Sequence, residues 1–160
     1  MEEKIASFTI DHEKLLRGVY VSRIDFAKEE LITTFDIRMK IPNVEPVLDN
    51  PALHAIEHLG ATFFRSDEEL SKKTIYFGPM GCRTGFYLIF AGRVESKEVV
   101  ETLKDMFKFI SEYEGKIPGQ SPVECGNYLD LNLPMAKYEA KLFLENTLEN
   151  IKEENLVYPN

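Results

Sequence analysis

Basic residues are outnumbered in this chain, and long apolar runs are missing from it. The 160 residues include 19 Lys and Arg against 27 Asp and Glu, so the formal net charge is −8. This balance argues against a nucleic-acid partner, because a phosphate backbone requires a positive surface. No apolar run approaches the ~20 residues that span a bilayer, and the first residues show no secretion signal. We therefore expect a cytoplasmic protein that binds neither nucleic acid nor membranes.

Cysteine and histidine are also scarce, with two residues of the first kind and three of the second. A disulfide is disfavoured in a reducing cytosol, so Cys82 and Cys125 are better candidates for metal binding or catalysis. The alternative is that both thiols are buried and pack as small hydrophobic groups. His12 stands alone in a mixed N-terminal segment, and a lone histidine is more often a satisfied polar group than a ligand.

What the chain does contain is the pattern of one α+β domain that spans residues 1–160. Period-two and aromatic-rich patterns predict about four mostly antiparallel strands, over residues 18–26, 31–40, 73–77 and 85–91. Apolar stripes predict helices from residue 51 to about 66, from 96 to about 115 and from 134 to about 154. Because the chain shows neither a repeat nor a linker, we expect the helices to pack on one face of the sheet.

The second predicted strand separates a core face from a polar face. Thr33, Phe35 and Ile37 share the apolar side, whereas Asp36 and Arg38 share the other. Arg38 therefore points away from the core, either to solvent or into a site, and the residues alone favour solvent.

The most informative stretch is the helix predicted to open at Pro51. Asn50 is a suitable N-cap, and Pro51 suits the first helical position. His54 and His58 are four residues apart, so their side chains lie on one face with Cβ atoms about 5–6 Å apart. Two imidazoles at this spacing can hold a divalent metal, and Glu57 leans over the same face as a candidate for proton transfer. The alternative is a surface helix with two solvated histidines.

A glycine-rich stretch, Gly78-Pro79-Met80-Gly81-Cys82-Arg83-Thr84-Gly85, follows the third predicted strand. Glycines at this density indicate a sharply turning backbone or the close approach of another group. Cys82 is therefore exposed to whatever fills the space, and Arg83 or a nearby metal would favour its thiolate. A metal site on the predicted helix needs at least a third ligand, for which the two loop cysteines and a distant acid are candidates.

Four motifs together resemble those of the S-ribosylhomocysteine lyase family. Their order and spacing match across nearly the whole chain, and four motifs in one short chain are far more specific than any one of them. The motifs are Phe35-Asp36-Ile37-Arg38, His54-Ala55-Ile56-Glu57-His58-Leu59, Pro79-Met80-Gly81-Cys82-Arg83-Thr84-Gly85-Phe86-Tyr87 and Glu124-Cys125-Gly126-Asn127-Tyr128.

The resemblance implies a metal-dependent carbon-sulfur lyase that is a homodimer with two active sites at the interface. It implies one divalent metal per subunit, which is ferrous iron in the cell and is often replaced by zinc or cobalt. The implied residues are His54, His58 and Cys125 as metal ligands, Glu57 and Cys82 as the acid/base pair, and Ser7, His12 and Arg38 in the substrate pocket.

The resemblance also implies the reaction. S-ribosylhomocysteine would be cleaved to homocysteine and 4,5-dihydroxy-2,3-pentanedione, the precursor of the quorum-sensing signal autoinducer-2, as in the activated methyl cycle. The thioether leaves only after the sugar carbonyl has moved to the position β to sulfur. Each aldose–ketose step needs a base and an acid, which a thiolate and a carboxylate can supply. A Lewis-acidic metal would stabilise the developing oxyanion.

One stretch departs from the family pattern. Family members often carry Ile-Asp-Ile-Ser ahead of the Pro-Met-Gly-Cys run, whereas this chain has Ile75-Tyr76-Phe77-Gly78. Tyr76 thus replaces an acid that could contact the substrate's amino group, which puts recognition of the homocysteine end in question.

Two other hypotheses remain open. The His-x-x-Glu-His order is that of inverted-motif zinc peptidases, in which Glu57 would activate water and a downstream glutamate would be the third ligand. A structural protein would instead bind its metal in a closed tetrahedral site. The ligands of that closed site would be His54, His58, Cys82 and Cys125. A third ligand at Cys125 favours the lyase, and a glutamate favours the peptidase.

Overall fold

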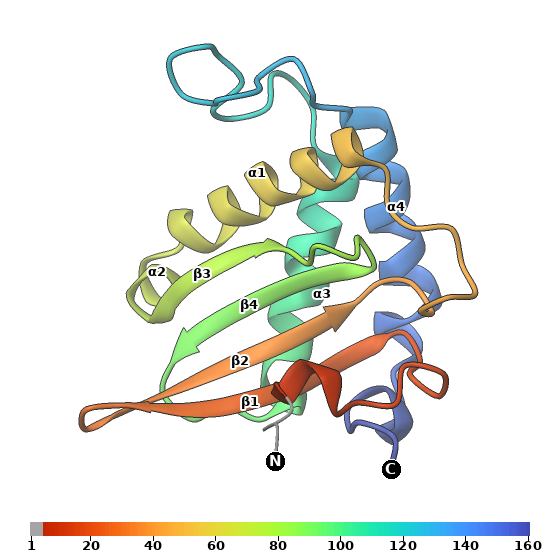
Figure 1. Cartoon of the computed structure of the whole chain (residues 1–160). Coiled ribbons are helices and arrows are strands. Elements are labelled where there is room, and N and C mark those ends of the chain that lie inside the picture. The colour runs from red at the N-terminus through yellow and green to blue at the C-terminus, as the bar shows by residue number, and fades with distance from the viewer. Residues whose placement is uncertain (1–4) are drawn as a thin grey trace.

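A computed structural model describes residues 5–160 as an antiparallel sheet with helices on one of its faces (Figure 1). The four strands lie in the spatial order β1-β2-β4-β3. Their bounds are Gly18–Ala27 (β1), Glu30–Arg38 (β2), Thr74–Pro79 (β3) and Gly85–Ala91 (β4). The expected α+β class, strand number and antiparallel pairing are therefore confirmed.

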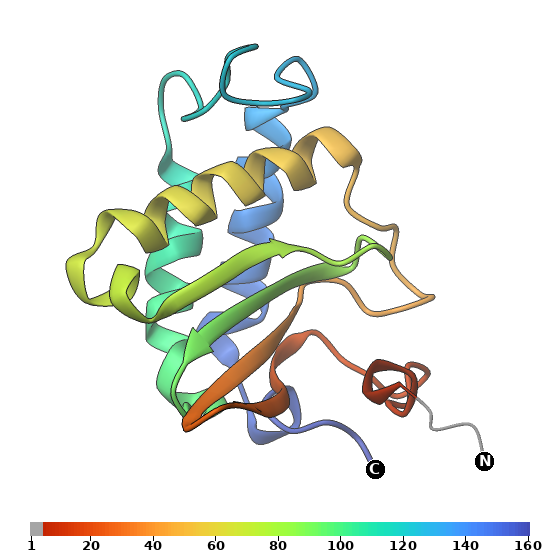
Figure 2. The ribbon, with the colours of Figure 1, turned by 60° about the vertical axis from the view of Figure 1, so that its left-hand side comes forward.

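Helices cover the side of the sheet that faces away from the viewer in Figure 1, and the view in Figure 2 shows them on one side. Their bounds are Asn50–Ser66 (α1), Glu68–Lys73 (α2), Ser96–Glu112 (α3) and Leu133–Asn146 (α4). A 3-10 turn, η1 (Ala6–Phe8), lies on the opposite side, in front of β1. Among residues 5–160, no helix is long and apolar enough to cross a bilayer.

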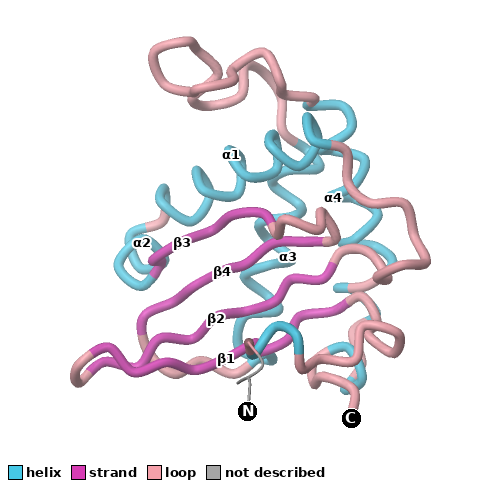
Figure 3. Tube along the Cα trace, viewed as in Figure 1, coloured by secondary structure: helices cyan, strands magenta, loops and turns pink. Residues whose placement is uncertain are grey.

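The hydrophobic core lies between the sheet and these helices. Phe35 and Ile37 of β2 are fully buried, as their place in the alternation predicts. The predicted stripe of α3 is buried too, and its Phe107 meets Phe143 of α4 edge-to-face at 5.0 Å between ring centroids. The helix α1 packs on β3, α3 and α4, and its N-terminal half lies beside the long loop that joins α3 to α4 (Figure 3).

Several element ends differ from the sequence predictions. A short helix, α2, precedes β3 and was not predicted. The N-cap of α3 is Glu95 and not Ser96, which had been expected to cap this helix; the Ser96 hydroxyl accepts a hydrogen bond from the Val21 N–H instead. The helix α4 ends at Asn146 rather than near residue 154, since the Asn150 side chain caps the Glu145 carbonyl and 3-10 turns follow.

Candidate active site

The helix α1 places two histidines side by side on its exposed face. Its N-cap is Asp49 rather than Asn50, because the Asp49 carboxylate accepts the Ala52 N–H at 2.7 Å. Pro51 lies in the first turn, as predicted. The rings of His54 and His58 meet edge-to-face with centroids 4.7 Å apart. The prediction of a shared histidine face is therefore confirmed.

Backbone carbonyls fix the tautomer of both rings. The Nδ1 of His54 lies 2.8 Å from the Asp130 carbonyl oxygen, and the Nδ1 of His58 lies 2.7 Å from that of Pro118. A carbonyl can only accept, so each Nδ1 carries the proton and each Nε2 presents a lone pair. These two Nε2 atoms face each other at 3.1 Å. Two acceptors at this distance repel unless a cation lies between them, which is the arrangement of metal-binding histidines.

The loop of residues 113–132 supplies a third donor to this pair. Cys125 Sγ lies 3.5 Å from the Nε2 of His54, and the three ligand atoms all lie within 4.8 Å of one another. The Asn127 N–H donates to the sulfur at 3.4 Å. Gly119 has a φ of +76°, and a Cβ there would lie 3.1 Å from the His58 ring. A glycine at this position thus lets the loop close over the histidines.

This donor set fits a metal ion. Two imidazole nitrogens and one sulfur leave a tetrahedral metal one open position, as in catalytic rather than structural sites. Among residues 5–160, the cluster of candidate ligands consists of His54, His58 and Cys125 and does not include Cys82. This argues against the closed four-ligand site. The third member is a cysteine and not a glutamate, which argues against the peptidase hypothesis.

Four of the other expected site residues line a separate cavity of about 390 Å³ on the open side of the sheet. Ser7, His12, Arg38 and Cys82 all contribute to its wall, together with Tyr87. The wall includes neither the metal-ligand candidates nor Glu57. One chain therefore brings the predicted substrate-binding residues to Cys82, but it does not bring the metal cluster to the same cavity.

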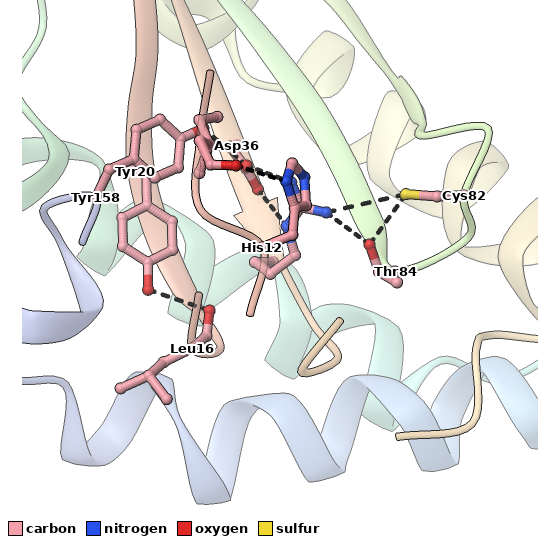
Figure 4. A network of polar contacts seen from close by, with 9 residues as sticks. His12, Leu16, Tyr20, Asp36, Cys82, Thr84 and Tyr158 are labelled. Carbon is pink, nitrogen blue, oxygen red and sulfur yellow. Dashed lines mark hydrogen bonds and ion pairs between the residues drawn. The ribbon is translucent and has the colours of Figure 1, made fainter. Parts of the chain in front are cut away.

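Arg38 is only 3% exposed, so the interpretation that it points to solvent is wrong. Its guanidinium forms a forked ion pair with Asp36, from Nε to Oδ1 at 3.0 Å and from Nη2 to Oδ2 at 2.5 Å. Its Nη1 donates to the Thr84 hydroxyl at 2.7 Å and lies 3.9 Å from Cys82 Sγ. Because that hydroxyl accepts from Arg38, its own proton is free for Cys82, at 3.1 Å. Figure 4 shows this chain of contacts.

Burial and charge act together on the groups around this ion pair. Burial alone would lower the pKa of Arg38, but the Asp36 carboxylate raises it above its ordinary value. Burial raises the pKa of the Tyr87 phenol, and the nearby Asp36 charge raises it further. Arg38 is thus a permanent cation beside Cys82, and Tyr87 presents a neutral hydroxyl to the same cavity.

The predicted site residues did not include Asp36, Thr84 or Tyr158. The alternation of β2 could have paired Asp36 with Arg38, since residues two apart share a strand face. No sequence pattern indicates that the Tyr158 hydroxyl donates to Asp36, at 2.8 Å, across 122 residues of chain.

The position of Tyr76 explains one local departure from the family pattern. Tyr76 is 47% exposed and lines a hollow with Ser7 and Tyr87. A Cβ on Gly78 would collide with the Tyr76 hydroxyl. Glycine at position 78 therefore gives the ring its space, and the two residues form a matched pair.

An α+β domain with a His-His-Cys donor set between one helix and one loop has the arrangement of a small metal-binding domain. The chain belongs to the S-ribosylhomocysteinase (LuxS) family, whose model matches residues 5–154. Proteins named S-ribosylhomocysteine lyase are among its relatives. That of Clostridium beijerinckii is 60% identical over 158 residues, which is 99% of each chain. That of Finegoldia magna is 56% identical over 98% of each chain.

Proposed function

We propose that this protein is a carbon-sulfur lyase that cleaves the thioether of S-ribosylhomocysteine to homocysteine and 4,5-dihydroxy-2,3-pentanedione. The observation that carries the proposal is the pair of facing Nε2 atoms next to Cys125, in a chain of this family. The conversion moves protons and breaks one carbon-sulfur bond with no net redox change, so it needs no redox cofactor. The product would serve as the autoinducer-2 precursor.

One divalent metal per subunit would be held by His54, His58 and Cys125. We propose ferrous iron in the cell, with zinc or cobalt as substitutes, because imidazole and thiolate ligands accept all three. The bound metal would supply Lewis acidity to the sugar oxygens. Metal analysis of protein purified without oxygen tests the identity of the ion.

Cys82 and Glu57 would carry the protons. The Cys82 sulfur is exposed to its cavity, and it contacts the Arg38 guanidinium and the Thr84 hydroxyl. Glu57 is half-buried on α1, and among residues 5–160 its carboxylate forms no ion pair or hydrogen bond. A carboxylate without a fixed partner is free to take and return a proton.

Ser7, His12 and Arg38 would bind the substrate beside Cys82. His12 uses its Nδ1 on the Ile10 carbonyl at 2.9 Å, which leaves Nε2 for a ligand. Arg38 directs four N–H groups to Asp36, Thr84 and Cys82, and a guanidinium has five, so one donor remains for a sugar hydroxyl.

We propose that a second copy of the chain completes each site, since the Cys82 cavity and the metal cluster do not meet within one chain. The open side of the sheet also exposes large apolar groups next to the cavity, among them Ile5 at 62% and Phe8 at 72%. Such a patch is typical of an interface. A homodimer is therefore the proposed state of the protein. The cytoplasm is its proposed location.

Release of free thiol from S-ribosylhomocysteine is the experiment that tests the function. The expected result is thiol release that is lost on chelation of the metal and restored by ferrous, cobalt or zinc ions. Metal-loaded protein that releases no thiol would contradict the proposal, and cleavage of a peptide substrate instead would favour the peptidase.

A further inference from the structure

The C-terminal segment, residues 154–160, lies against β1 beside the ion pair of the Cys82 cavity. The rings of Tyr158 and Tyr20 stack with centroids 4.9 Å apart (Figure 4). The Tyr20 hydroxyl donates to the Leu16 carbonyl at 3.1 Å. A Cβ on Gly18 would lie 2.2 Å from the Asn155 carbonyl oxygen, so glycine there admits the segment. These contacts place the segment in one fixed position.

From that position Tyr158 acts on Asp36. Its hydroxyl donates to Asp36 Oδ2 at 2.8 Å, the same oxygen that accepts Nη2 of Arg38. A third donor on the carboxylate fixes its plane, and the forked pair then fixes the plane of the guanidinium. Burial raises the pKa of Tyr158, and the Asp36 charge raises it further, so the phenol remains a donor at neutral pH.

The orientation of Arg38 in turn decides what faces Cys82. Asp36 binds the Nε and Nη2 atoms of Arg38. The remaining nitrogen, Nη1, therefore points toward Thr84 Oγ1 and Cys82 Sγ. The other titratable groups that face the sulfur in the cavity are His12 and Tyr87.

The C-terminal segment also contacts the N-terminal segment that includes His12. Lys14 Nζ donates to the Asn160 carbonyl at 3.0 Å, and Asn155 Nδ2 donates to the Arg17 carbonyl at 2.9 Å. The C-terminal residues thus contact both the N-terminal segment and the Asp36–Arg38 pair.

We propose that Tyr158 and Asp36 are positioning residues of the Cys82 site, so that the C-terminal segment is a working part of the enzyme. The inference rests on the proposed role of Cys82 in proton transfer. Tyr158 touches no reacting atom in this scheme, and it acts through Asp36 and Arg38.

Tyr158→Phe in the metal-loaded protein tests the proposal, since it removes the hydroxyl and keeps the stacked ring. We expect kcat for thiol release to fall about three- to tenfold, the range for one lost hydrogen bond, with KM little changed. Alkylation of Cys82 by iodoacetamide at neutral pH should slow by a similar factor. The metal-bound Cys125 should be protected, and Cys82→Ala identifies the alkylated site.

Tyr20→Phe is the matched control, because its hydroxyl contacts the carbonyls of Leu16 and of Glu154 in the same segment and does not contact Asp36. It should lower the thermal midpoint without changing Cys82 alkylation. The proposal is overturned if Tyr158→Phe keeps the wild-type kcat and alkylation rate, or if both variants slow equally. If the wild-type protein releases no thiol, the proposed function fails, but the alkylation comparison still decides the positioning role.

Discussion

The Nε2 atoms of His54 and His58 face each other at 3.1 Å, and in the neutral rings the carbonyl contacts of both Nδ1 atoms leave a lone pair on each Nε2. Such a contact between two lone pairs is unfavourable in isolation. It becomes favourable with a cation, and Cys125 Sγ adds a third donor at 3.5 Å.

Cys125→Ala should therefore abolish tight metal binding. Outer partners of metal ligands are alone worth about 10–100-fold in affinity, so loss of a ligand should cost at least about 100-fold. Metal content after dialysis against a weak chelator measures the effect. Cys82→Ala is the matched cysteine control and should keep the metal while it loses turnover. A Cys82→Ala protein that loses metal and unfolds would reinstate the closed four-ligand site.

Glu57→Gln should retain the metal and lose activity. The amide keeps the size of the side chain but cannot accept a proton, and general acid–base groups contribute about 10²–10⁴-fold. Thiol release and metal content are measured on the same preparation. Glu149→Gln, at an exposed position, should leave both unchanged. Undiminished thiol release in Glu57→Gln would remove Glu57 from the reaction.

Mixing two inactive variants should restore activity if each site draws on two chains. After Glu57→Gln and Cys82→Ala subunits exchange, half of the dimers are mixed and one of their two sites is intact. Thiol release should recover to about a quarter of the wild-type value. If both residues served one site from the same chain, no mixed dimer would contain an intact site. Absence of recovery despite proven exchange would therefore refute the shared site.

Alkali should destabilise the protein through its buried tyrosines. Burial, and then the Asp36 charge, raise the pKa of both Tyr20 and Tyr158. Their stabilising effect is complete below the unfolded pKa of about 10 and is lost as the pH rises above it, because the unfolded chain ionises first. The free energy of unfolding should fall by up to ~1.4 kcal/mol per pH unit for each phenol. Urea unfolding of Tyr158→Phe should show a shallower fall, and an unchanged slope would contradict this origin.

The local pattern was enough to predict the elements that carry the site. The strand β4 has the predicted bounds, and α1 ends at the predicted Ser66. Helix geometry alone places His54 above His58, since the spacing of four residues equals about one turn. The predictions of helix caps and helix ends were less accurate. Asp49 and Glu95 are the N-caps of α1 and α3, and not the adjacent Asn50 and Ser96, because neighbouring polar side chains compete for the same backbone hydrogen bonds.

The sequence by itself thus determined a shared face for two imidazoles, a turning loop around Cys82 and, through its motifs, the family. Only the tertiary structure decided that Cys125 joins those imidazoles, that Arg38 is buried against Asp36, and that Tyr158 holds this pair. The physical reason is range. Helical and strand periods relate residues a few positions apart, whereas the contact of Cys125 with His54 spans 71 residues and that of Tyr158 with Asp36 spans 122. The Asp36–Arg38 pair lies on one strand face, but its further partners Thr84 and Tyr158 are 46 and 122 residues away.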